Sequence, residues 1–89
     1  MPPMNPIELR DCVYNYIQYI GEEYILAEME EVKEGEDADG IDEVLHNLFQ
    51  QYAFDVLGPE VSSANLKGFI KEMKLQMMVI YTTSGIMHE

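Results

Sequence analysis

Apolar residues recur every three or four positions over most of this chain, and that spacing limits its fold more than any other feature. Side chains at this period share one face of an α-helix, whereas a half-buried strand requires apolar and polar residues to alternate. The pattern is most regular in residues 41–57, and Gly58 and Pro59 then predict the end of that helix. The apolar members are Ile41, Val44, Leu45, Leu48, Phe49, Tyr52, Val56 and Leu57. We therefore expect an all-α fold.

A second helical segment precedes this one and begins with a strong start signal. Asn5 suits the N-cap and Pro6 the first helical position, and Glu8 stands three residues after the cap, which completes a capping box. The apolar spacing predicts a helix from there to about Val32. Gly21 lies in its middle and lowers helix stability by about 1 kcal/mol relative to alanine. A kink in this first helix is therefore consistent with the sequence.

The third helical segment begins at Ser62 or Ser63 and becomes apolar nearly all round from Leu75 onward. Because Val, Ile, Tyr and Thr favour strands, a short strand over 77–82 is the alternative to continued helix. We expect helix. The apolar end consists of Leu75, Met77, Met78, Val79, Ile80 and Tyr81.

The three segments are expected to form one small bundle over residues 1–89, with an N-terminal arm at 1–4 and a C-terminal tail at 84–89. A chain of 89 residues buries about 60–65% of its unfolded surface, so its core is thin. The helix of residues 41–57 is expected at the centre because its apolar face is the most regular. The side chains expected to be largely buried there are Leu45, Leu48, Phe49 and Tyr52.

The charge is strongly acidic and unevenly placed. Seventeen acidic residues face five basic ones, and the formal net charge is −12. Residues 22–43 hold eleven of the acids and one base, whereas residues 61–88 hold three lysines and one acid. Such a field repels nucleic acid and anionic membranes and attracts basic protein surfaces. The expected partner is therefore a protein with a basic surface, although acidity that only maintains solubility is the alternative.

Part of this acidity lies where helix physics opposes it. Near the end of the first predicted helix, Glu34 is three residues from Glu31 and four from Glu30, so like charges repel there, and the helix dipole is unfavourable. This placement indicates a binding role. The residues predicted to bind the partner are Glu30, Glu31, Glu34, Glu36, Asp37 and Asp39.

Carboxylates at this helical spacing are about 5–6 Å apart, a distance comparable to that between phosphates along a DNA strand. In size, acidity and helix content the chain resembles small virus-encoded inhibitors of restriction or CRISPR enzymes. That resemblance implies a nucleic-acid mimic that inhibits a nucleic-acid-handling protein.

The rival hypothesis is an adaptor or structural subunit that docks through the apolar end of the third helix. One small domain cannot easily cover so much apolar surface, and a homodimer is the simplest way to bury it. The residues predicted for self-association or partner binding are Leu75, Met77, Met78 and Tyr81. Binding by the acidic face should be salt-sensitive, whereas apolar docking should tolerate salt.

The sequence argues against metal, cofactor and catalytic sites. If Gly40 stood at position 6 of a calcium-binding EF-hand loop, position 1 would be Gly35 and position 12 His46, so two ligands would fail. One cysteine and two histidines do not make a structural zinc site. Cys12 has no basic neighbour in sequence and borders the apolar face of the first helix, as a small core residue does. We expect no enzyme activity.

Location is indicated by what the sequence lacks. A single cysteine, Cys12, cannot form an internal disulfide, which favours a reducing compartment. The first residues show neither the basic nor the apolar region of a signal peptide, and no apolar run has the length of a membrane span. These features favour a cytoplasmic protein.

Two short stretches resemble the acyl carrier proteins, which are small, acidic and helical. Asp39-Gly40-Ile41-Asp42 is similar to the Asp-Ser-Leu at the start of that family's second helix, and Phe54-Asp55-Val56 with Pro59 is similar to the Phe-Asp-Ile…Pro that closes it. The resemblance covers about twenty residues. Gly40 replaces the serine that carries the phosphopantetheine arm, so the resemblance implies a related fold without the carrier chemistry.

Overall fold

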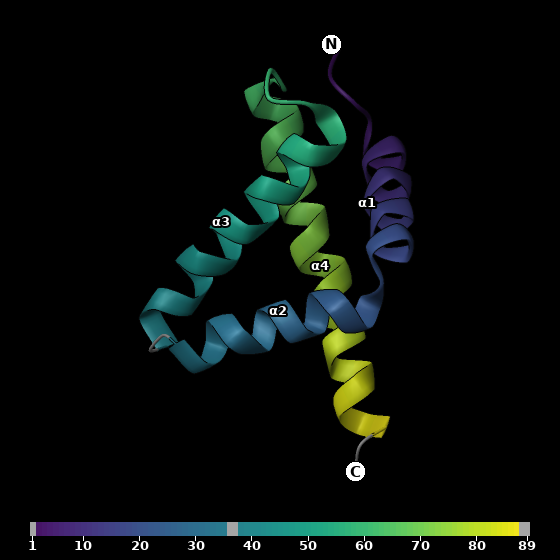
Figure 1. Ribbon diagram of the computed structural model, residues 1–89. Coiled ribbons are helices and arrows are strands. Elements are labelled where there is room, and N and C mark those ends of the chain that lie inside the picture. Colours follow the sequence, from purple (N-terminus) through teal and green to yellow (C-terminus); the bar gives the residue numbers. More distant parts are fainter. Residues whose placement is uncertain (1, 36–37, 88–89) are drawn as a thin grey trace.

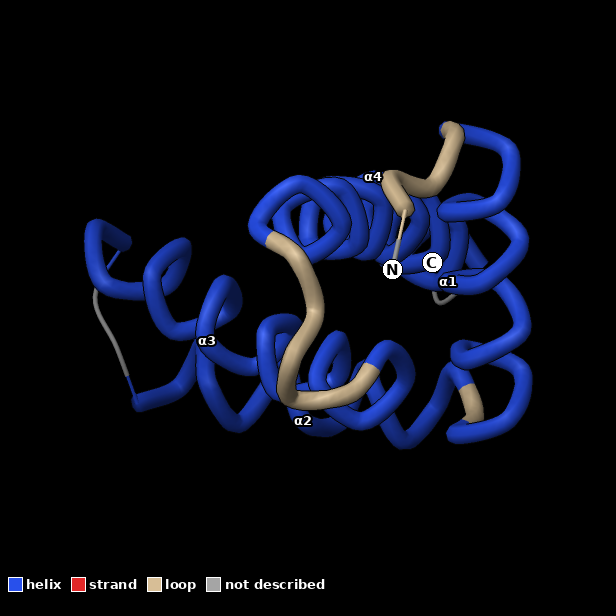
Figure 2. The backbone as a smooth tube through the Cα atoms, turned by 90° about the horizontal axis from the view of Figure 1, so that it is seen from above, coloured by secondary structure: helices blue, strands red, loops and turns tan. Residues whose placement is uncertain are grey.

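The computed structural model describes residues 2–35 and 38–87, and within them the chain forms four helices and no strand (Figure 1). Short loops interrupt the helical chain at residue 21 and at residues 58–62 (Figure 2). The all-α prediction is confirmed, but the expected number of three main helices is wrong because the first predicted helix is two. The helices are α1 (Pro6–Ile20), α2 (Glu22–Gly35), α3 (Ala38–Leu57) and α4 (Ser63–Met87).

Gly21 separates α1 from α2 completely. Its φ is +103°, a region that residues with a Cβ atom rarely adopt, and its N–H donates to the carbonyl of Ile17 at 2.8 Å. The next turn restarts at once, since the N–H of Ile25 donates to the Gly21 carbonyl at 3.2 Å. As a result α2 leaves the direction of α1 and crosses α4 (Figure 1), and Ile25 becomes fully buried.

The predicted start of the first helix at Asn5 and the predicted stop at Gly58 are confirmed. The Asn5 side chain accepts from the Glu8 N–H at 2.8 Å, and the Asn5 N–H donates to the Glu8 carboxylate at 3.4 Å, so the capping box forms as expected. The helix α3 ends at Leu57, directly before Gly58, whose φ is +92°. Residues 77–82 are helical, so the strand alternative is wrong, and α4 continues to Met87 through part of the expected tail.

The N-terminal arm is tied to the first turn of α4 through one buried side chain. The Met4 N–H donates to Oδ1 of Asn65 at 2.8 Å, and Nδ2 of Asn65 donates to the carbonyl of Pro2 at 3.2 Å. Asn65 is 1% exposed. Its amide thereby satisfies two backbone groups of a segment that would otherwise have no partners.

The centre of the bundle is α4, not α3 as the sequence suggested. α4 packs against α1 on one side and α3 on the other. Phe49 and Tyr52 are buried as predicted, whereas Leu45 and Leu48 are only partly buried at the edge of the core. The buried apolar residues are Val13, Ile17, Ile25, Phe49, Tyr52, Ala53, Phe69, Ile70, Met73 and Met77.

Candidate functional site

An apolar groove of about 300 Å³ lies between α2, α3 and α4. Its floor is apolar, since Phe49 and Met77 line it and are each 1% exposed. The wall from α4 comes from positions separated by three or four residues, which share one helix face. The lining residues are Met29 and Glu30 of α2, Asp42, Leu45 and Phe49 of α3, and Lys74, Met77, Met78, Tyr81 and Thr82 of α4.

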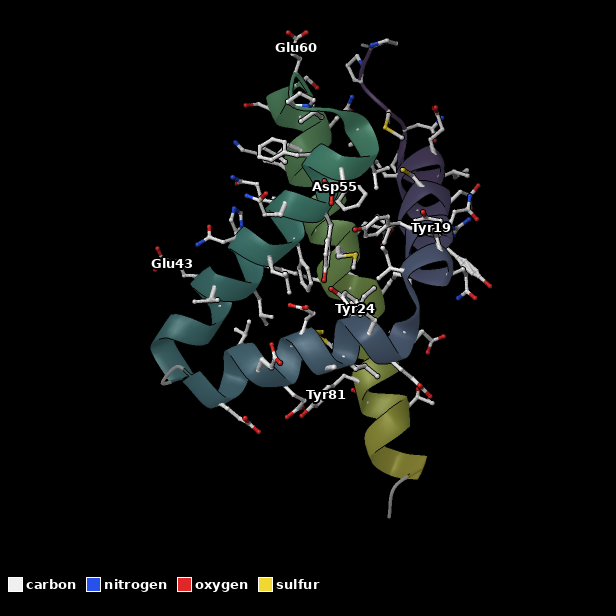
Figure 3. The ribbon with its side chains drawn as sticks, viewed as in Figure 1. Tyr19, Tyr24, Glu43, Asp55, Glu60 and Tyr81 are labelled. Atoms are coloured by element: carbon white, nitrogen blue, oxygen red, sulfur yellow. The ribbon has the colours of Figure 1, made fainter. Side chains whose placement is uncertain are left out.

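The rim of the groove is charged. Nζ of Lys74 lies 3.4 Å from Oδ1 of Asp42, so an ion pair links α4 to α3 at one side. Both side chains reach solvent, and such exposed pairs contribute only about 0.2–1 kcal/mol. Glu30 of α2 lines the groove as well and has no salt bridge among the described side chains. The exposed carboxylate of Glu43 (labelled in Figure 3) follows Asp42 on α3.

The structure describes half of the predicted acidic face. Glu30, Glu31 and Glu34 are exposed along the C-terminal half of α2, and Glu30 also lines the groove. Glu36 and Asp37 lie outside the described residues. The backbone of Asp39 belongs to the first turn of α3, and its side chain lies outside the described part.

The four residues of the predicted apolar face lie in three different environments. Met78 and Tyr81 line the groove and are 65% and 39% exposed. Leu75 is exposed on the neighbouring face of α4. The sequence suggested that Met77 is available at the surface, but the residue is buried. It belongs to the core and to the groove floor.

A basic face lies beside the groove, over the junction of α3 and α4. Lys67, Lys71 and Lys74 project from one side of α4, and His46 of α3 lines the same shallow depression. His46 is exposed, as expected for the polar face of its helix. Lys67 and Lys71 therefore lie away from the acidic α2, whereas Lys74 lines both this depression and the groove that Glu30 borders.

The residues of α2 and α3 that complete the groove could not be identified from the sequence. Met29, Leu45 and Phe49 read as core residues of separate helices, and nothing local shows that they face the same space. One signal was present, because Met29 lies off the apolar face shared by the rest of the first predicted helix. A residue displaced in this way indicates that the second half of a helix buries a different side.

Neither a metal site nor an activated nucleophile is apparent in the described part of the chain. No group of three or more His, Cys, Asp and Glu side chains there is arranged to hold a metal ion. Burial raises the pKa of the Cys12 thiol, which keeps it protonated and a weak nucleophile. Among the described helices, none is long and apolar enough to cross a membrane.

Comparison of the chain with protein-family models, with curated proteins and with solved structures found no match. The surfaces described above are therefore the basis for assigning a function.

Proposed function

We propose that this chain is a small, acidic, non-catalytic binding protein that engages the basic surface of another protein, in particular one that handles nucleic acid. One observation supports this more than any other. The acidic edge of α2 and the apolar end of α4, which compete as interfaces in the sequence, border a single groove. Glu30 stands on one wall of it, and Met78 and Tyr81 on another.

Such a groove suits a partner that presents an apolar side chain among basic ones. The apolar side chain would enter the groove and cover Phe49 and Met77, and burial of its surface would supply most of the affinity. The basic side chains would approach Glu30, Glu31 and Glu34. Each exposed pair contributes little, so the acids act together by attracting the partner over a distance.

Mimicry of nucleic acid follows from the same face. Carboxylates on α2 at helical spacing lie about 5–6 Å apart, so a protein channel that binds consecutive phosphates could accept them. Occupation of that channel would inhibit the partner. The charge of −12 over 89 residues favours this role over direct contact with nucleic acid.

A second candidate function, that of an adaptor or of a subunit that self-associates, is favoured by the exposed apolar residues of α4 outside the groove. Leu75 and Val79 are 52% and 66% exposed on that helix. A contact centred on them would bury apolar surface and tolerate salt. A carrier-like role is disfavoured because Gly40, at the position of the attachment serine, has no hydroxyl group.

The test is capture of the partner from native lysate at low and high salt, followed by charge reversal. Glu30, Glu31 and Glu34 are changed together to Lys, and Asp11, Glu23 and Glu60 serve as a matched set with the same change of net charge. All six are exposed. The proposal expects the first set to abolish salt-sensitive binding and the second to weaken it far less.

Two results would contradict it. Equal loss with both sets would mean that only net charge matters, and unchanged, salt-tolerant binding by the first set would assign the function to α4. Light scattering of the purified chain, whose monomer mass is 10.3 kDa, then decides whether the α4 contact joins two copies.

A further inference from the structure

Three tyrosines and two carboxylates converge where α1, α2 and α3 meet, and none of them lines the groove. We call this set the tyrosine cluster: Tyr16 of α1, Tyr24 and Glu28 of α2, and Tyr52 and Asp55 of α3. Its base is aromatic, because the rings of Tyr16 and Tyr52 lie 5.2 Å apart between centroids and are tilted by 52°. In Figure 3, Asp55 and Tyr24 lie on the sides of α3 and α2 that face α1, whereas Tyr19 points outward.

The hydroxyl group of Tyr52 is buried in this cluster without a hydrogen-bond partner. The residue is 7% exposed. Burial, and next the charge of Glu28, raise the pKa of Tyr52, and Asp55 acts in the same direction. Both carboxylates therefore act electrostatically on a hydroxyl group that makes no hydrogen bond in the described part of the chain. A buried polar group left in this state calls for an explanation.

The outer part of the cluster is open and negatively charged. Tyr24 is 56% exposed, and its hydroxyl donates a hydrogen bond to the Glu28 carboxylate, which raises the pKa of Tyr24. Asp55 is exposed on α3. Neither Glu28 nor Asp55 forms an ion pair with a described side chain. The cluster thus combines an exposed tyrosine and two carboxylates with an unpaired hydroxyl group.

We propose that the tyrosine cluster is a binding site for an arginine side chain of a protein partner. A guanidinium group is planar and stacks on a tyrosine ring, and its fork of five donors suits a site that combines carboxylates of two helices with the unpaired oxygen of Tyr52. A lysine ammonium is compact and more strongly hydrated, so it serves such a site less well. The site stands on its own residues and does not depend on the groove.

The test uses two blocked pentapeptides, Gly-Gly-Arg-Gly-Gly and Gly-Gly-Lys-Gly-Gly, titrated into the ¹⁵N-labelled protein. The arginine peptide should shift the amide signals of the tyrosine cluster and bind several-fold more tightly than the lysine peptide. The double variant Glu28→Gln, Asp55→Asn should weaken arginine binding by about tenfold. Glu60→Gln, an exposed acid on the α3–α4 turn (Figure 3), should leave it unchanged.

Tyr52→Phe provides a readout that a purely structural role would not produce. It should weaken the arginine peptide by about threefold to tenfold, since one acceptor is lost, while the fold is kept. The proposal is overturned if the arginine peptide causes no shift at the cluster. It is also overturned if arginine and lysine peptides bind equally, or if the double variant binds like the parent. The peptide titration uses the parent protein and variants of the tyrosine cluster and needs no protein partner, so the two proposals can fail separately.

Discussion

Replacing Tyr52 with Phe should make the protein more stable, which is unusual for a change in a core. The substitution removes only the hydroxyl oxygen and keeps the ring, whose centroid lies 5.2 Å from that of Tyr16 and 6.2 Å from that of Phe49. That oxygen is buried and makes no hydrogen bond, so its desolvation is uncompensated. An unsatisfied buried polar group costs about 1–3 kcal/mol.

We therefore expect Tyr52→Phe to raise the free energy of unfolding by about 1 kcal/mol, because folding of the variant no longer removes a hydroxyl group from water without a compensating hydrogen bond. In a domain of this size that corresponds to a rise in Tm of about 4–8 °C. Urea unfolding at neutral pH, followed by circular dichroism, measures the change. Tyr19→Phe is the control, since Tyr19 is 84% exposed and its change should stay within about 0.5 kcal/mol. A fall in stability with Tyr52→Phe would mean that the hydroxyl has a partner, and the arginine site would lose its acceptor.

Three further changes test other parts of the fold. Gly21→Ala should lower the free energy of unfolding by about 1 kcal/mol or more, measured by urea unfolding, because φ is +103° although no atom crowds the position. Asn65→Ala should cost about 1–3 kcal/mol and speed amide exchange at Met4, because the N-terminal arm loses both of its hydrogen bonds to that side chain. Burial, then Asp55, raises the pKa of Tyr16 from 10.0 to about 12, so the stability it contributes is complete below pH 10 and is lost as the pH rises through 12. Alkaline unfolding should therefore set in between these values together with ionisation of Tyr16, followed by NMR of its ring, and ionisation of Tyr16 at the usual pH in the folded state would contradict this.

Local signals in the sequence were sufficient for the start of α1 and the end of α3. Asn5 and Glu8 interact within one turn, and Gly58 stops α3 by its own backbone preference, so neither depends on distant residues. The complete break at Gly21 could not be predicted in this way. A glycine inside an apolar pattern is compatible with a straight helix, a kink or a break. Burial of Ile25 against the rest of the bundle selects the break.

The site was predictable in its parts and not in its assembly. Glu30, Met78 and Tyr81 were identified from charge and apolar patterning, but their meeting at one groove depends on the turn at Gly21, which directs α2 across α4. The tyrosine cluster was missed for a related reason. Tyr16 and Tyr52 belong to the apolar faces of two helices and read as ordinary core residues, so only their packing reveals the unpaired hydroxyl.

The shared groove changes what the salt experiment should show. If the acids and the apolar residues lay on separate surfaces, binding would be either salt-sensitive or salt-tolerant, depending on which surface is used. On one surface, the acids control the association rate and the apolar residues control the dissociation rate. Exposed carboxylates such as Glu31 and Glu34 attract a basic partner over a distance, so salt and charge reversal should slow association. The groove floor acts only after contact, and Met78→Glu, at a residue that is 65% exposed, should leave association nearly unchanged and speed dissociation. Surface plasmon resonance at two salt concentrations separates these effects. If salt changed only the dissociation rate, or if Met78→Glu slowed only association, the acidic edge and the groove would not act as one interface.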